Sequence, residues 1–148
     1  MANRQYKQGF YEVQNKDKYL GKKDPRYLSS YELEVFKFCD RSPSVTSWGA
    51  EVVIVPYYST VKQRKARYIV DVYVEYIDKE NVKHKLLVEI KPTKDLKKPE
   101  MTHRKKKETF IQESLTWQTN KEKWTSAYKY AEERGWKFCI WTEREIFG

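Results

Sequence analysis

The chain has 148 residues, close to the commonest size of one domain, and its aromatic content of 16% compensates for a hydrophobic content of only 39%. This composition excludes a disordered chain, while the lack of a long apolar run or a signal-like segment argues against a membrane span and against export. Lys and Arg number 30 against 21 Asp and Glu, and the resulting net charge of +9 favours nucleic acid as a partner, with anionic membrane as the alternative.

The N-terminal part differs in character from the rest of the sequence. We predict a basic, polar arm over residues 1–25, which lack sustained periodicity, and one domain over residues 26–148, which contain no repeat or flexible linker. A helix is predicted from about Ser29 to about Cys39. Ser29, followed three residues later by Glu32, fits the capping box that opens a helix.

The middle of the chain has the pattern of three strands. The apolar run 51–55 fits a strand that Pro56 ends, and the polar, basic segment 57–67 fits a loop. Two longer runs, 68–77 and 82–90, flank a polar turn. Their spacing predicts a β-hairpin.

The C-terminal part is expected to add a helix and a strand. The basic segment 94–107 passes into a helical pattern, and a clear helix begins with Asn120 as its N-cap and ends before Gly135. Residues at helical spacing predict its buried stripe: Trp124, Ala127, Tyr128 and Ala131. The last strand is 136–141. This order of elements predicts an α/β fold with a central mixed β-sheet flanked by α-helices.

The predicted hairpin brings two acidic residues together. Asp71 and Glu89 each lie nine residues from Glu80, so a hairpin centred there places them opposite one another. Two carboxylates in this position repel each other unless a divalent cation lies between them. Lys91 follows on the same face and could position a water or stabilise charge on a phosphate, and the backbone carbonyl of Ile90 is a further candidate ligand. The same spacing also fits a simple exposed ion pair.

The other face of the hairpin is expected to be apolar. Alternation along the two strands places six residues there: Val70, Val72, Val74, Leu86, Val88 and Ile90. Packing of this face in the core would leave Asp71, Glu89 and Lys91 together on the opposite face of the sheet.

Glu32 is a further acidic candidate. On a helix it shares a face with Val35, Phe36 and Cys39, and an acid on such an apolar stripe needs a partner or a function. The alternative is that Glu32 serves only as the acid of the capping box, and the two roles are compatible. Glu34 lies on another side of the helix and is expected to be a surface charge.

Two groups of basic residues flank the predicted site, one before the strand of Asp71 and one after Lys91. They are Lys62, Arg64, Lys65, Arg67, Lys94, Lys97, Lys98, Arg104, Lys105, Lys106 and Lys107. Lys and Arg in such positions can hold DNA phosphates without reading the base sequence. A solvated charged surface is the alternative, and salt distinguishes the two because each phosphate contact contributes about 0.9 to the log–log slope of binding.

The candidate residues occur in an ordered series of motifs. These are Ser29 to Glu32, the block Arg67-Tyr68-Ile69-Val70-Asp71, the block Leu87-Val88-Glu89-Ile90-Lys91-Pro92, and a later helix and strand with Asn120, Lys123, Trp124, Ala127 and residues 140–143. The series resembles the PD-(D/E)XK nuclease superfamily, specifically its TnsA-type endonuclease catalytic domain, over roughly residues 26–146. Val70 departs from the Pro of that motif.

The resemblance implies a restriction-endonuclease-like core and a Mg²⁺- or Mn²⁺-dependent DNA endonuclease with four catalytic residues, Glu32, Asp71, Glu89 and Lys91. The overall pattern is also similar to the head-completion nucleases of T-even-like tailed phages. That likeness implies action on double-stranded DNA ends with portal or neck proteins, in the host cytoplasm during assembly or in the virion. The alternatives are a structural DNA-end or neck-binding protein that needs no cleavage, and another nuclease role such as junction resolution or transposon end cutting.

Overall fold

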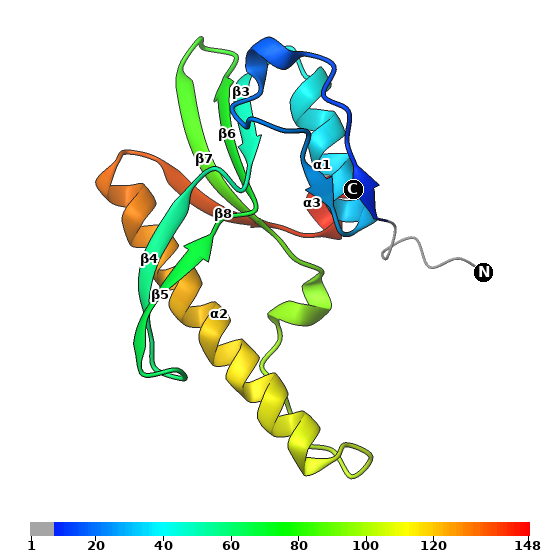
Figure 1. The fold of residues 1–148 in the computed structure, drawn as a ribbon, viewed down its shortest axis with the longest axis vertical. Coiled ribbons are helices and arrows are strands. Elements are labelled where there is room, and N and C mark those ends of the chain that lie inside the picture. Colours follow the sequence, from blue (N-terminus) through cyan, green and yellow to red (C-terminus); the bar gives the residue numbers. More distant parts are fainter. Residues whose placement is uncertain (1–7) are drawn as a thin grey trace, which may run out of the picture.

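A central four-stranded sheet organises the protein in the computed structural model, which describes residues 8–148 (Figure 1). Its strands are, in spatial order, β3 (Val45–Ala50), β6 (Val72–Ile77), β7 (Lys83–Ile90) and β8 (Lys137–Trp141). The first three pair antiparallel, whereas β8 lies parallel to β7. The predicted α/β fold with a central mixed sheet is therefore confirmed.

One face of the sheet packs against α1 (Ser30–Arg41), α3 (Glu143–Phe147) and the N-terminal segment. The core on this side joins Phe36 of the helix to Trp48 and Val88 of the sheet, and all three side chains are buried. The predicted helix after Ser29 is confirmed, because the Ser29 side chain caps it. This first core holds one side of the sheet rigid.

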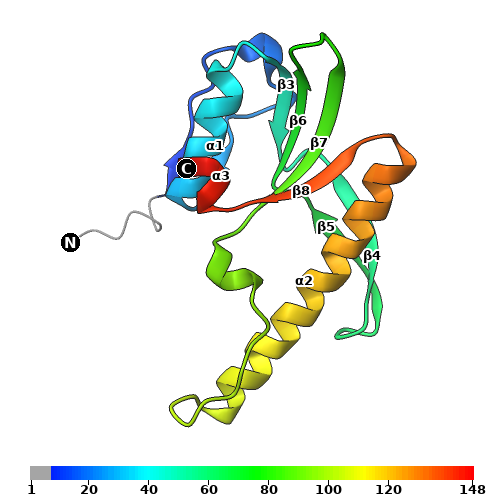
Figure 2. The same cartoon turned by 180° about the vertical axis from the view of Figure 1, so that it is seen from behind.

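The opposite face packs against α2 (Lys107–Glu133) and a separate hairpin formed by β4 (Ile54–Ser59) and β5 (Arg64–Ile69). Ala127 and Ala131 are fully buried, and their small side chains let the helix approach the sheet closely. The hairpin lies alongside α2 in both views of the fold (Figures 1 and 2). The sheet is thus the middle of three layers.

The first half of α2 extends beyond the sheet (Figures 1 and 2). The segment after β7 includes the short 3₁₀ helix η3 (Thr93–Leu96) and runs along this half of α2 to the start of the helix at Lys107. Although α2 has 27 residues, no helix within residues 8–148 is apolar and long enough to cross a membrane.

The predicted bounds of α2 are correct at one end and wrong at the other. The helix continues through Asn120, which is therefore not its N-cap. The helical pattern expected after the basic segment 94–107 is the first half of this same helix. Because the buried residues of α2 are Ala127 and Ala131, no apolar stripe joins that half to the second in the sequence. Tyr128, which we expected on the stripe, is 57% exposed. The predicted end is confirmed, because Gly135 adopts a φ of +73°, the left-handed conformation that favours glycine after a helix.

Residues 8–25 of the predicted N-terminal arm pack against α1 and the sheet. Tyr11 and Val13 are buried in the first core. The buried Asp40 accepts hydrogen bonds from the Tyr11 hydroxyl at 2.6 Å and from the backbone N–H of Asn15 at 3.0 Å. This segment therefore joins the domain, whereas the first seven residues of the predicted arm lie outside the described part of the chain.

The predicted strand 51–55 and loop 57–67 are both wrong. The chain forms β3 before this region and the β4–β5 hairpin through it, where Pro56 lies opposite Arg67. Because β4 pairs only with β5 among the described strands, Pro56 lies on a sheet edge, where its missing N–H is tolerated. Every second residue of β4, such as Tyr57, is buried. On β5 the exposed basic residues obscure the strand pattern.

The predicted strand 68–77 is divided at Val70 and Asp71, which lie between β5 and β6. This interruption directs Val70 into the second core, on the α2 side, whereas Val72 and Val74 belong to the first. The expectation that the three valines share a face is therefore wrong for Val70. The consequence for function is that Asp71 lies at a strand junction rather than in the middle of a strand.

Candidate active site

The pairing of β6 with β7 determines the position of Asp71. Val72 lies opposite Val88 and Tyr73 opposite Leu87, so the predicted register about Glu80 is confirmed. Continuing this register by one residue brings Asp71 to the level of Glu89. The Asp71 Oδ2 atom accepts a hydrogen bond from the backbone N–H of Ile90 at 2.8 Å, which fixes the carboxylate against β7.

The Glu89 carboxylate is held at both of its oxygens. Its side chain is buried, with 8% exposed, and its Oε1 atom accepts a hydrogen bond from the hydroxyl of Tyr68 on β5. Its Oε2 atom lies 3.7 Å from the Nζ atom of Lys91. The backbone N–H of Lys91 donates to the Trp141 carbonyl of β8 at 3.0 Å, so the sheet also holds the lysine.

The two acids and the lysine line one open cavity of about 320 Å³. Its other lining residues come from β5 and α2 and include two cationic side chains, Arg67 and Lys123. The predicted site residues Asp71, Glu89 and Lys91 are therefore brought together at an accessible surface. A cavity with acids beside basic side chains can hold a phosphate group next to a cation.

Glu32 approaches the same centre from α1. Its Oε1 atom accepts a hydrogen bond from the backbone N–H of Leu28 at 2.6 Å, and its own N–H donates to the Ser29 hydroxyl at 3.3 Å. Glu32 also lines a small cavity with Asp71 and Glu51. The predicted capping box is therefore only half formed: Ser29 caps the backbone N–H of Glu32, but the Glu32 carboxylate bonds to Leu28 instead of Ser29. The same carboxylate lies beside Asp71.

The electrostatics of the site reflect its crowded acids. Burial, followed by the charges of Glu89 and Glu32, raises the pKa of Asp71 to about 8, although the Ile90 N–H and Lys91 oppose the shift. Burial also raises the pKa of Glu32, with smaller contributions from the Glu51 and Glu89 charges. The pKa of these carboxyl groups is raised because the buried site disfavours their negative charge, and a bound cation would offset that charge.

The donor set fits a hard divalent cation. Within residues 8–148, no group of three or more His, Cys, Asp and Glu side chains is arranged to hold a metal ion. Asp71 and Glu89 supply two carboxylates, and the backbone carbonyl of Ile90 directly follows Glu89 in sequence. Mg²⁺ is commonly bound through one or two carboxylates and keeps its other positions for water and substrate phosphate, so a third acidic ligand is not required.

The predicted DNA-binding residues fall into three groups. Arg67 lines the cavity of the acids. A second group lines a larger adjoining cleft: Lys94, Lys97, Lys98 and Lys105. The remainder line neither of these hollows and are exposed on the hairpin or near the start of α2: Lys62, Arg64, Lys65, Arg104, Lys106 and Lys107.

Sequence reasoning did not assign several residues of the site. Tyr68 and Lys123 were visible only as parts of the motif series, and the hydrogen bond from Tyr68 to Glu89 depends on the unpredicted β4–β5 hairpin. Arg26 and Glu51 line the small cavity with Glu32. Glu51 gives no sequence signal, because it reaches the site through a turn in which its φ is +56°.

Comparisons with known proteins agree with this geometry. Residues 42–143 match the model of the TnsA-like endonuclease N-terminal family, a range that includes Asp71, Glu89 and Lys91 but not Glu32. The chain is also 35% identical over 135 residues to the head completion nuclease of Enterobacteria phage T4, with 87% of this chain and 86% of that protein covered. Fold and site thus define a restriction-endonuclease-like nuclease fold, and both comparisons support a nuclease role. The chain belongs to the TnsA-like endonuclease family.

Proposed function

We propose that this protein is a Mg²⁺- or Mn²⁺-dependent DNA endonuclease that hydrolyses phosphodiester bonds. The observation that carries the proposal is that Asp71 and Glu89 line one accessible cavity together with Lys91. We assign the cation to these two carboxylates and the backbone carbonyl of Ile90. When bound, such a cation makes water more acidic and neutralises charge on phosphate oxygens.

The protein's own groups have distinct tasks in this proposal. The hydroxyl of Tyr68 and the N–H of Ile90 hold the two carboxylates in place. Lys91 can orient the attacking water or stabilise negative charge that develops on the phosphate, because its Nζ atom lies at the same cavity. Glu32 adds a third carboxylate on the other side of Asp71, which strengthens the attraction for a cation.

DNA is the substrate that the charge distribution favours. The net charge of +9 attracts polyanions, and Arg67 and Lys123 stand at the cavity of the acids. Such side chains hold phosphates irrespective of base sequence, so we propose non-sequence-specific contacts with double-stranded DNA.

The relative from phage T4 is a head completion nuclease, and its name suggests where this activity is used. We propose that the protein acts on DNA ends during completion of a phage head and assembly of the neck, in the host cytoplasm or attached to the virion. Portal or neck proteins would then be its partners. The alternative proposal is a DNA-end or neck-binding protein that needs no cleavage. It differs because its function would not require Lys91.

A plasmid-nicking assay tests the enzymatic proposal. The purified protein is incubated with supercoiled plasmid and Mg²⁺, Mn²⁺ or EDTA, and Asp71→Ala and Lys91→Ala are compared with the wild type. We expect nicking that EDTA abolishes and that both variants lose, while filter binding shows that they still bind the plasmid.

Matched controls come from the β6–β7 turn, where Lys79 and Glu80 are exposed and distant in sequence from the site. Lys79→Ala and Glu80→Ala remove the same kinds of charge and should nick at the wild-type rate. Full activity in Asp71→Ala would disprove the assigned site. A wild type that binds DNA but cuts none, with any of the three additions, would favour the structural alternative.

A further inference from the structure

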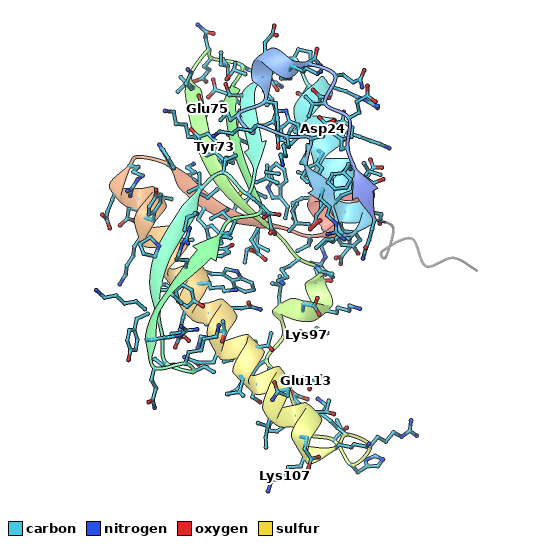
Figure 3. The ribbon with its side chains drawn as sticks, in the orientation of Figure 1. Asp24, Tyr73, Glu75, Lys97, Lys107 and Glu113 are labelled. Carbon is cyan, nitrogen blue, oxygen red and sulfur yellow. The ribbon has the colours of Figure 1, made fainter. Side chains whose placement is uncertain are left out.

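A second and larger hollow, of about 780 Å³, adjoins the acidic cavity. One side is formed by the segment that follows β7 and the other by the first half of α2; Figure 3 shows Lys97 on the segment and Glu113 on the helix. Lys91 and Asn120 line both hollows. We call the larger one the α2 cleft; it is continuous with the candidate active site.

The α2 cleft is suited to phosphate groups. Lys94, Lys97 and Lys98 line it, and within residues 8–148 none of the three forms an ion pair with a carboxylate. Lys105 is different, because it pairs with Glu113 at 2.6 Å and joins the two sides at one end of the cleft. The lysines nearer the acidic site are therefore available to an anionic ligand.

Trp117 is the one large aromatic side chain that lines the cleft within residues 8–148. The sequence has five tryptophans, and the other four lie in or against the two core clusters, as Trp48 and Trp136 illustrate. Trp117 belongs to neither cluster within the described residues and is half-buried. The Nζ atoms of Lys121 and Lys98 lie 4.4 Å and 5.7 Å from its ring centre. Packing of the core therefore does not explain why a tryptophan occupies position 117.

We propose that the α2 cleft binds unpaired nucleotides that flank the scissile phosphate, with one base stacked on Trp117 and the lysines on the phosphates. This inference rests on the proposed function. Because Lys91 lines both hollows, a DNA strand bound at the acidic site could continue into the α2 cleft. An aromatic platform among lysines is the usual means of holding single-stranded nucleic acid. A volume of about 780 Å³ is in the range of pockets that hold one small ligand, about 300–1,000 Å³.

Binding measured in EDTA tests the inference without any cleavage. The first probe is a duplex with a short unpaired thymidine flank, and the second is a fully paired duplex of equal length. We expect Trp117→Ala to weaken binding of the flanked duplex about 5- to 150-fold, the range for loss of one stacked base, and to leave the paired duplex unaffected. Trp117→Phe keeps an aromatic ring and should retain most of the affinity.

A matched control and a spectroscopic readout separate stacking from a general loss of structure. Leu115→Ala changes an exposed apolar side chain of the same helix that does not line the cleft, and it should bind both probes as the wild type does. In a third probe, 2-aminopurine occupies the unpaired position; stacking on Trp117 should quench its fluorescence in the wild type and not in Trp117→Ala. A flank without bases should bind the wild type and Trp117→Ala equally.

Two results would overturn the inference: equal affinity of Trp117→Ala and the wild type for the flanked duplex, or equal weakening of both probes. These failures are distinct from failure of the proposed nuclease. If plasmid nicking depends on Asp71 but the affinity for the flanked duplex does not depend on Trp117, only the cleft proposal is lost. If the quenching depends on Trp117 and no DNA is cut, the nuclease proposal is lost with the scissile phosphate, whereas binding of unpaired nucleotides in the α2 cleft is retained.

Discussion

Asp71 lies directly before β6 and Glu89 lies on β7 of the central sheet, whereas the lysines of the α2 cleft lie on the segment between β7 and α2, which extends beyond the sheet (Figure 1). The acids are held by backbone and side-chain hydrogen bonds, and Glu89 is buried. Lys94 and Lys97 are exposed. For the proposed function we infer a division of labour between the two regions. Catalysis requires side chains in fixed positions, whereas contact with DNA phosphates requires only accessible positive charge.

Loss of Lys91 should have the largest effect, and it should fall on cleavage rather than on binding. Lys91→Ala removes the ammonium group that we propose stabilises the reacting phosphate, so we expect nicking to fall about 10²- to 10³-fold, as when one stabilising donor is removed from an active site. Nicking rates at saturating plasmid measure the effect. Lys79→Ala is the matched control. A variant that loses affinity and cleavage to the same extent would contradict the division of labour.

Removal of the lysines of the α2 cleft should weaken DNA binding and leave the rate of cleavage at saturating DNA unchanged. In the combined variant Lys94→Ala, Lys97→Ala and Lys98→Ala, we expect the log–log slope of DNA binding against salt to decrease by about 2.7, or about 0.9 for each phosphate that a lysine no longer neutralises. Fluorescence anisotropy over a range of salt concentrations gives this slope. Nicking at saturating DNA should remain near the wild-type rate, and a collapse of that rate would show that the cleft participates in the chemistry.

A smaller effect is expected at Tyr68, whose hydroxyl donates a hydrogen bond to Glu89. Tyr68→Phe leaves one oxygen of a buried carboxylate without its hydroxyl partner, at a cost of about 1.5–3 kcal/mol for a hydrogen bond to a charged group. We expect a roughly tenfold or greater loss of cleavage together with weaker Mn²⁺ binding measured by calorimetry. Tyr58→Phe, an exposed tyrosine on β4, serves as control. Unchanged Mn²⁺ binding in Tyr68→Phe would show that the hydroxyl does not position Glu89.

The smallest and most specific effect concerns pH. The pKa of Asp71 in the folded, metal-free protein is raised to about 8, so the native state holds a proton that the unfolded chain has already released. Stability of the metal-free protein should therefore fall as pH rises from the ordinary carboxyl range towards 8, and Mn²⁺ affinity should rise over the same interval because binding displaces that proton. Calorimetry at several pH values measures both trends, and Asp71→Asn should flatten them.

The sequence predicted the relative positions of the candidate site residues better than it predicted the elements around them. The register about Glu80 and the helix that carries Glu32 follow from short-range patterns, namely alternation and a capping box, and both are confirmed. The β4–β5 hairpin was missed because basic residues occupy the outward positions of β5 and Pro56 resembles a strand end.

Long-range contacts account for the rest. The contact between Tyr68 and Glu89 depends on how the hairpin folds against the sheet, which no local pattern specifies. The first half of α2 lacks an apolar stripe because it has no sheet to pack against, so the sequence did not show that the helical pattern after residue 107 continues through Asn120 as one helix. Trp117 could be recognised as a tryptophan outside the core only after the other four had been assigned to it.

We propose above all that Asp71, directly before β6, and Glu89, on β7, bind one divalent cation between them. Isothermal titration of Mn²⁺ into the metal-free protein tests this most directly, with Asp71→Asn and Glu89→Gln as the informative variants and Glu80→Gln as the matched control. We expect heat of binding in the wild type and in Glu80→Gln, and its loss in each of the other two. Undiminished Mn²⁺ binding after either substitution at the site, or none in the wild type, would contradict the account.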